Sequence, residues 1–426
     1  MCAKPRVLFV DDEPYVLSGL RRMLRDQRRV WEMDFVNCGI AALEKFAEQP
    51  YDVIVTDMRM PGMDGAELLT HVARDYPQTV RLVLSGQSKQ ERIFRAIGPA
   101  HQFLSKPCDE QMLVRTVERA CGVCSRLQNK SLQKIVSRIG VLPSLPQLYR
   151  RLVEELESAD ASVDRVGEII ESDLAMSAKV LQLTNSSFFG LPHHVTCPRH
   201  AVSMLGLSTV RALGLSAGAF AQFEPSAAGF SLEAAVQHGL AVATAARRIA
   251  ESEGTDSNLV DDSFIAGLLH DIGQLILATH LSRTYEECLQ LSRAEKLPLW
   301  KAELEVVGTT HGEIGAHLLE LWGLPTPIVE AVALHHRPGQ AVGSQFTPLT
   351  AVHVADCLQN GHANSHPHVV MDEQSVASTD PGELSQAELA DHDLDLAYLS
   401  MLHLDRRLES WRQLSNPPPI TFNFTA

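Results

Sequence analysis

The chain has 426 residues, of which 45% are hydrophobic and 21% charged, a composition typical of a soluble globular protein and not of a disordered or fibrous one. Its 37 Lys and Arg against 52 Asp and Glu give a formal net charge of −15, which argues against DNA as a partner because non-specific DNA binding depends on cationic side chains. No run reaches the about 18 apolar residues of a membrane helix, and two aspartates precede any signal-peptide core, so we expect a cytoplasmic protein without a membrane segment.

The length suggests two or three domains at roughly 150 residues each. Eight cysteines are too sparse in a chain of 426 residues for a disulfide scaffold. Cys121 and Cys124 have the spacing of a metal-binding pair, but no second pair or nearby histidine completes a zinc site, which favours ordinary thiols.

The first domain is predicted to be an α/β fold. Short β-rich runs alternate with amphipathic stretches over residues 6–122, a pattern that indicates a parallel sheet with helices on both faces. Five such units favour a flavodoxin-like five-stranded parallel sheet, in which ligands bind beyond the carboxyl ends of the strands. The predicted strands are Val7–Val10, Met33–Val36, Val53–Thr56, Leu82–Leu84 and Phe103–Leu104.

Polar residues fall at the ends of these strands, where we expect them to converge on one rim. Asp11 and Asp12 follow the first strand, and Asp57 ends the third. Three neighbouring carboxylates repel one another unless a cation joins them, and Mg²⁺ prefers such an oxygen site. A carboxylate at Asp57 can attack a phosphoryl group while Mg²⁺, the ammonium of Lys106 and the hydroxyl of Ser85 share the developing charge.

The motifs VLFVDDE, VIVTDMRMPGMDG, LVLSG and FLSKP resemble the receiver domain of two-component response regulators, over residues 1–122. The resemblance implies a phosphorelay in which a sensor histidine kinase transfers a phosphoryl group to Asp57. It also implies that Ser85 and Phe103 form the switch pair that responds to phosphorylation.

The same resemblance implies a magnesium site. Asp12 would bind Mg²⁺ directly, Asp11 would bind it through water, and Asp57 and the backbone carbonyl of Arg59 would complete the protein ligands. Lys106 would contact the phosphoryl group.

Residues 123–140 are predicted to form a helical linker that continues the last receiver helix. The stretch is equally consistent with a solvated spacer and with a helical dimerisation surface, so a homodimer stays open.

From residue 141 to 358 the apolar spacing of three and four predicts an all-α domain without alternating strands. Histidines and aspartates recur beside its apolar runs, and together they are a candidate first shell for a divalent transition metal. The alternative is a core of histidines hydrogen-bonded to one another. These residues are His238, His270, Asp271, His311, His335, His336 and Asp356.

This region is similar to the HDOD domain, the HD-related output domain, in the motifs LPSLPQLYRRL, IIESDLAMSAKVLQLTNSSFFG, AVSMLGLSTVRALGL, GLLHDIG, HGEIGAHLLELWGLP and AVALHHRP. HDOD domains belong to the HD superfamily of metal-dependent phosphohydrolases but are generally regarded as non-catalytic. The resemblance therefore implies an output that acts by contact with a downstream signalling protein.

The order of the histidines and aspartates also resembles the metal ligands of HD-GYP phosphodiesterases, which hydrolyse cyclic di-GMP. Three departures argue against that activity: Gln274 stands where those enzymes have a phosphate-contacting lysine, Ala234 stands where some have a glutamate ligand, and no GYP follows the two adjacent histidines. We therefore predict a non-catalytic output, with a metal-dependent phosphohydrolase as the alternative.

The last segment, residues 359–426, is predicted to contain a Ser-, Asp- and His-rich flexible loop and then a packed C-terminal helix over residues 394–414.

Overall fold

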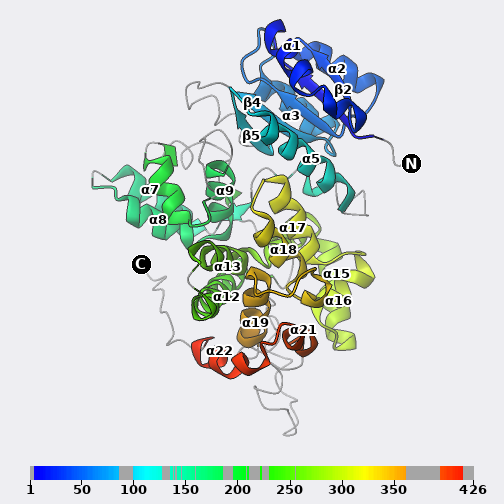
Figure 1. Ribbon diagram of the computed structural model, residues 1–426. Helices are drawn as coiled ribbons and strands as arrows, with labels where there is room; N and C mark the ends of the chain where they lie inside the picture. Colours follow the sequence, from blue (N-terminus) through cyan, green and yellow to red (C-terminus); the bar gives the residue numbers. More distant parts are fainter. Residues whose placement is uncertain are drawn as a thin grey trace. The chain divides into compact units, whose positions relative to one another are not determined.

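A computed structural model describes residues 4–85, 99–126, 135–137, 139, 142–144, 146–158, 160–185, 195–207, 209–210, 221–222, 230–254, 256–360 and 394–415. The chain forms two compact units (Figure 1). The first contains residues 1–224 and 317–325, and the second contains residues 225–316 and 326–426.

The first unit begins with a five-stranded sheet in which every neighbouring pair of strands is parallel, in the order β2-β1-β3-β4-β5. This confirms the predicted flavodoxin-like α/β fold. The central strand β3 is buried at all four positions, as expected for a parallel strand with helices on both faces. The strands are β1 (Arg6–Val10), β2 (Glu32–Val36), β3 (Val53–Thr56), β4 (Val80–Ser85) and β5 (Gln102–Ser105).

Four helices that accompany this sheet are described. The remaining helix, expected between β4 and β5, falls on residues 86–98, outside the described residues. Helix α3 begins close to the end of β3 because Asp64 caps it by accepting a hydrogen bond from Glu67 N (2.9 Å). Gly65 permits this approach, since a Cβ there would lie 2.1 Å from the carbonyl oxygen of Asp57. The helices are α1 (Pro14–Met23), α2 (Gly39–Glu48), α3 (Gly65–Asp75) and α5 (Glu110–Arg126), with a 3₁₀ turn, η1 (Asp26–Arg29).

The remainder of the first unit is mainly helical. It also contains a pair of two-residue strands, β6 (Pro143–Ser144) and β7 (Ala221–Gln222), which are too short to be the alternating strands that the sequence argued against. Most of the predicted 123–140 linker lies outside the described residues, apart from the end of α5 and residues 135–137 and 139. The helices are α7 (Pro146–Glu157), α8 (Val163–Glu171), α9 (Leu174–Thr184) and α10 (Pro198–Leu205).

Strand β5 is an edge strand of the sheet, but it is not exposed. The carbonyl oxygen of His101, just before β5, accepts a hydrogen bond from Gln182 Nε2 on α9 (2.8 Å). Gln102 Nε2 donates to the carbonyl oxygen of Leu321 (3.0 Å). Beside them, the buried Arg81 donates to the carbonyl oxygen of Ser137 (2.7 Å), and burial lowers its pKa to about 9. The edge of the receiver sheet is thus bonded to residues outside the receiver domain, all within the first unit.

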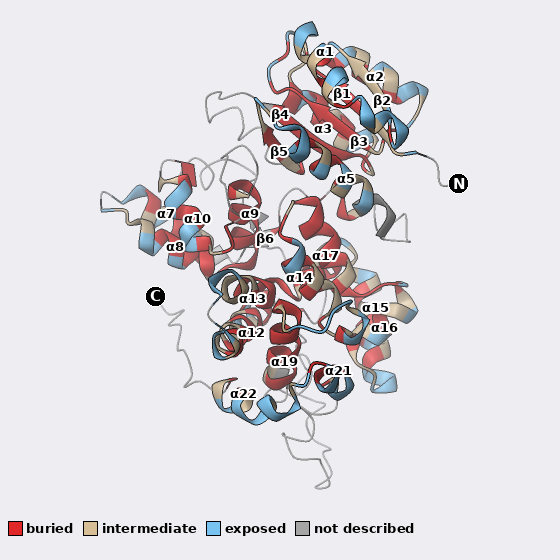
Figure 2. Cartoon of the chain, in the orientation of Figure 1, coloured by how far each residue is buried: buried red, intermediate tan, exposed pale blue. Residues whose placement is uncertain are grey.

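The second unit is helical, and Figure 2 shows α19 largely buried, while α12 and α13 combine buried residues with intermediate and exposed ones. Its 22-residue helix α12 packs against α13 and α19. The helices are α12 (Leu232–Glu253), α13 (Ser257–Leu269), α14 (Ile272–His280), α15 (Ser282–Glu295), α16 (Leu299–Val306), α17 (His311–Leu321, shared with the first unit), α18 (Thr326–Leu334) and α19 (Pro348–Asn360), with a 3₁₀ turn, η3 (Pro338–Gln340).

The predicted single C-terminal helix is two helices, α21 (Leu396–Met401) and α22 (Leu408–Ser415), separated by a 3₁₀ turn, η5 (Asp405–Arg407). His403 has φ 59° and breaks the helical path, because an α-helix requires negative φ. The predicted flexible loop falls almost entirely on residues 361–393, outside the described residues.

Among the described helices, none is by itself long and apolar enough to cross a membrane, although one bent pair, Ser257–His280 with Ser282–Glu295, passes that test jointly.

Asp262 on α13 should make stability depend on pH. Burial, aided by the charges of Asp261 and Asp256, raises its pKa to about 7. Because the unfolded state ionises at lower pH, native stability is lost as pH rises from about 4 to 7. Asp262→Asn should therefore stabilise the protein by about 1 to 2 kcal/mol at pH 8 and by less at pH 5, as measured by thermal unfolding. An equal effect at both pH values would contradict this explanation.

Candidate phosphoacceptor and metal sites

The rim at the carboxyl ends of β1, β3 and β5 brings together the acidic residues and the lysine predicted from the sequence. Lys106 Nζ donates to Asp11 Oδ2 (2.5 Å) and to Asp57 Oδ1. The two aspartates are 2% and 7% exposed, so their charges need a cation nearby. Burial alone would lower the pKa of Lys106, but its bonds to these carboxylates raise it.

The rim also fits the predicted magnesium site. Asp12 is half-buried beside Asp11, and Asp57 supplies a third carboxylate, a set of oxygen ligands suited to Mg²⁺. The backbone N–H of Arg59 donates to Asp57 Oδ2, which orients the carboxylate.

The two residues of the predicted switch pair lie on neighbouring strands. Ser85 is the last residue of β4 and pairs in register with Ser105 of β5. The structure describes the backbone of Ser85 but not its side chain. Phe103 on β5 is 2% exposed. Phe103 directly follows His101 and Gln102, whose contacts cover the sheet edge, and Ser85 lies on the neighbouring strand.

In the second unit, all seven histidines and aspartates predicted as metal ligands come together as two adjoining groups. Within each group the candidate ligand atoms all lie within 4.8 Å of one another. One group is His238, His270 and Asp356, and the other is Asp271, His311, His335 and His336.

A glycine allows the helices that carry these residues to approach closely. Gly273 lies in the first turn of α14, two residues after Asp271, and a Cβ there would lie 1.9 Å from the carbonyl oxygen of His311 at the start of α17. A larger residue would therefore force the two helix ends apart.

Asp271 connects the two groups. Its Oδ1 lies 3.0 Å from His311 Nε2, and its Oδ2 lies 3.3 Å from His270 Nε2. His238 Nε2 lies 3.1 Å from Asp356 Oδ1, which is also 3.5 Å from His270 Nε2. A carboxylate with one oxygen toward each group can bridge two ions.

The backbone orients two of the imidazoles. His270 Nδ1 donates to the carbonyl oxygen of Gly267 (2.7 Å), and His335 Nδ1 donates to that of Val332 (2.8 Å). Their Nε2 atoms therefore point into the cluster, and His270 Nε2 has no hydrogen-bond partner of acceptable geometry among the residues that the structure describes. This orientation is typical of metal-binding histidines, whose second nitrogen donates to an outer partner.

His311 is oriented in the same way by a residue that the sequence reading missed. Its Nδ1 donates to Glu303 Oε2 on α16 (2.8 Å), and its Nε2 lies 3.3 Å from His335 Nε2 and 3.1 Å from His336 Nε2. With the Nδ1 protons of His311 and His335 directed outward, these Nε2 lone pairs would face each other unless a cation or a further proton lay between them. The donor set therefore fits divalent transition metals.

Charge in the cluster is unevenly distributed. Burial lowers the pKa of His335 to about 3, helped by the neighbouring His270 and His311. Burial also opposes protonation of His311, but Glu303 and Asp271 raise its pKa to about 10. Without metal, the carboxylates thus retain protons on some of the histidines.

The Gln274 side chain does not take the phosphate-contacting role that a lysine would have at this position. It is 3% exposed, and its Oε1 accepts a hydrogen bond from Tyr285 OH (3.1 Å). The side chain is therefore engaged inside the protein.

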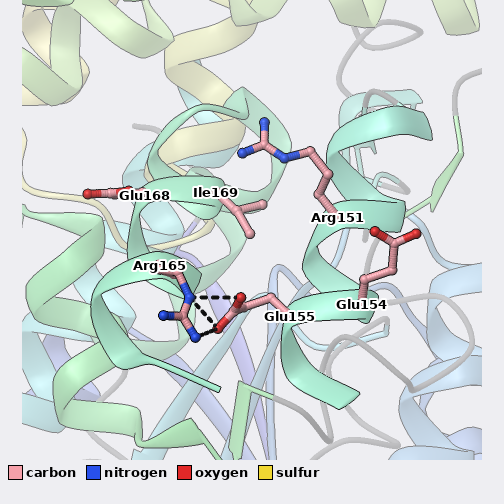
Figure 3. Close-up of a pocket in the computed structure, with 6 residues that line it drawn as sticks. All are labelled: Arg151, Glu154, Glu155, Arg165, Glu168 and Ile169. Carbon is pink, nitrogen blue, oxygen red and sulfur yellow. Dashed lines mark hydrogen bonds and ion pairs between the residues drawn. The ribbon is translucent and has the colours of Figure 1, made fainter. Parts of the chain in front are cut away.

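A surface pocket elsewhere, of about 350 Å³ between α7 and α8, carries charged groups without metal-binding or nucleophilic chemistry (Figure 3). Its Arg165 and Glu155 pair with each other at 2.9 Å. The pocket is lined by Arg151, Glu154, Glu155, Arg165, Glu168 and Ile169.

Comparison with known proteins assigns both domains. The response regulator receiver domain family matches residues 7–118, and the HDOD domain family matches residues 142–338. An uncharacterized protein of Treponema pallidum is 22% identical over 329 residues, which cover 74% of this chain and 59% of that protein. The hydrogenase transcriptional regulatory protein HoxA of Cupriavidus necator is 33% identical over 160 residues, 37% of this chain and 31% of that protein.

Among solved structures, the signal receiver domain of an HD domain-containing protein from Pseudomonas fluorescens is 29% identical, with a TM-score of 0.28, and covers 29% of this chain and 98% of that one. The chain spans less than two thirds of the length of the two curated relatives named above. The parallel sheet, the acidic rim and the two family matches lead to one assignment: the chain contains a response regulator receiver domain followed by an HDOD domain.

Proposed function

We propose that the chain is a phosphorelay response regulator in which Asp57 accepts a phosphoryl group from a sensor histidine kinase. The observation that carries this proposal is the pair of bonds from Lys106 to Asp11 and Asp57 at the carboxyl rim of the parallel sheet. Asp57 is the nucleophile, and its carboxylate is held by Lys106 and by the backbone N–H of Arg59. Asp11, Asp12 and Asp57 would hold Mg²⁺, whose charge would help to neutralise the transferred group.

The output of this regulator is proposed to be contact between the HDOD domain and a downstream signalling protein. The burial of Gln274 and its bond to Tyr285 support a non-catalytic domain, because the position offers no charge to a phosphate. The His and Asp cluster is proposed to hold divalent metal ions that stabilise the domain.

A second candidate function is a metal-dependent phosphohydrolase of the HD-GYP type, acting on cyclic di-GMP. It is favoured by the bridging position of Asp271 between the two groups of ligands. Two bound ions would supply a hydroxide near neutral pH and charge to clamp a phosphate. A substrate would have to approach the ions beside Asp271 and His336. Their side chains, at 13% and 21% exposure, are the most accessible of the seven candidate metal ligands.

Phosphorylation is proposed to act through Ser85 at the end of β4 and Phe103 on the edge strand β5. The bonds from Gln182 to the carbonyl of His101 and from Gln102 to the carbonyl of Leu321 give this edge a route to helices outside the receiver domain. A change of a few kcal/mol in these contacts would shift such an equilibrium almost completely.

Hydrogen exchange tests this route. Loading the receiver with beryllofluoride, a phosphoryl mimic, should change exchange in β5 and α9 several-fold, while α12 serves as an internal reference. The Asp57→Asn chain, treated with the same reagent, should show no change. Identical exchange in β5 and α9 with and without the mimic would refute the proposed route.

A further inference from the structure

A buried carboxylate lies directly behind one histidine of the metal cluster. Glu303 is 0% exposed, and its Oε2 accepts hydrogen bonds from both the backbone N–H of His311 (2.7 Å) and His311 Nδ1 (2.8 Å). Its Oε1 has no hydrogen-bond partner among the described residues. Because a buried charge is costly unless it is paired, this carboxylate depends on His311 for its stabilisation.

The partner of His311 differs in kind from the partners of the other oriented histidines. His270 and His335 donate their Nδ1 protons to neutral backbone carbonyls, whereas His311 donates its proton to a carboxylate. A charged acceptor forms a stronger hydrogen bond and makes the opposite ring nitrogen a better electron donor. His311 should therefore be the most strongly donating imidazole of these three.

We propose that Glu303 is a positioning residue of the HDOD metal centre, acting through His311. The inference rests on the proposed metal binding. Glu303 holds the Nδ1–H tautomer of His311, directs Nε2 toward Asp271 Oδ1 at 3.0 Å, and places a further negative charge behind ligands that are mainly neutral imidazoles. The consequence is tighter binding of a divalent cation in the group that contains His311, His335 and His336.

A purely structural role must be separated from this one, because Glu303 also bonds the backbone N–H at the start of α17. Glu303→Gln retains an acceptor oxygen of similar shape but removes the charge. Glu305→Gln is the matched control, since Glu305 is an exposed carboxylate on the same helix, α16. Glu303→Asp retains the charge with a shorter side chain and should restore part of the effect.

Cobalt binding by the full chain provides the test. The protein is stripped of metal, and Co²⁺ is titrated with detection by its visible absorption bands and by competition with a chelator. Glu303→Gln should raise the Kd for Co²⁺ by about 10- to 100-fold and shift the absorption bands, while Glu305→Gln leaves both unchanged. Wild-type affinity and spectrum in Glu303→Gln would overturn the proposal. Wild-type protein that takes up no Co²⁺ would instead refute the metal site itself.

A measurement on the wild-type chain keeps the proposal testable if Glu303→Gln does not fold. In protein labelled with ¹⁵N-histidine and loaded with Zn²⁺, the ring of His311 should carry its proton on Nδ1, with the downfield proton shift of a hydrogen bond to a carboxylate. A proton on Nε2, or an Nδ1 proton without that shift, would overturn the assignment.

Discussion

Replacing Asp57 by Asn should abolish phosphoryl incorporation from acetyl phosphate or from the cognate kinase. The amide that replaces the carboxylate cannot form an acyl phosphate, so the loss is expected to be complete. The environment of Asp57 gives the residue a specific role: Lys106 Nζ and the backbone N–H of Arg59 each bond one of its oxygens, which leaves the carboxylate held at the rim. Incorporation is measured as acid-stable and base-labile label on the intact chain.

Asp75→Asn is the matched control for this experiment. Asp75 is an exposed carboxylate of the same domain, paired with Arg74 at 2.8 Å and remote in sequence from the rim residues, so its removal should leave labelling unchanged. Label that persists in Asp57→Asn and does not map to Asp11 or Asp12 would show that the phosphoacceptor lies elsewhere.

The receiver fold could be predicted because its strands are local patterns. Buried parallel strands appear as continuous apolar runs, and Val53–Thr56 was predicted with the bounds that the structure has. The convergence of Asp11, Asp57 and Lys106 also followed, since the carboxyl ends of parallel strands lie at one edge of a sheet. The ends of the other strands differed by one or two residues, as expected where pairing rather than propensity sets the limit.

The contacts that cover the sheet edge could not be predicted. Gln182 lies on α9, a helix buried at every position, so its sequence has no polar face from which a partner could be inferred. Its bond to the carbonyl of His101 joins residues 81 positions apart, and helical periodicity shows which face is apolar but not which element that face contacts.

The metal cluster was predicted as a set of residues but not as an arrangement. Adjacent His270 and Asp271 suggested ligands, yet the division into two groups connected by Asp271 depends on how the helices that carry these residues pack together. Glu303 was missed because nothing in LWKAELEV distinguishes it from Glu305, two positions later. Burial alone separates them, and burial is set by the packing of α16 against α15.

Replacing Asp271 by Ala should remove most of the metal from the HDOD domain. Its two oxygens face different groups, at 3.0 Å from His311 Nε2 and 3.3 Å from His270 Nε2, so a single substitution weakens both. Loss of one ligand typically dismantles a site, and the apparent stability contributed by the metal is lost with it. Metal content by elemental analysis and the change in Tm on adding Mn²⁺ are the measurements, with His280→Ala, an exposed histidine at the end of α14, as the control.

The same proteins decide between the two output functions. We expect no hydrolysis of cyclic di-GMP by the wild-type chain with Mn²⁺ or Fe²⁺, because Gln274 is buried against Tyr285 and supplies no positive charge to a phosphate. Metal uptake that is lost in Asp271→Ala, without turnover in either protein, would support a metal-stabilised binding module. Turnover in the wild type that requires metal and disappears in Asp271→Ala, but not in His280→Ala, would establish the phosphohydrolase in its place.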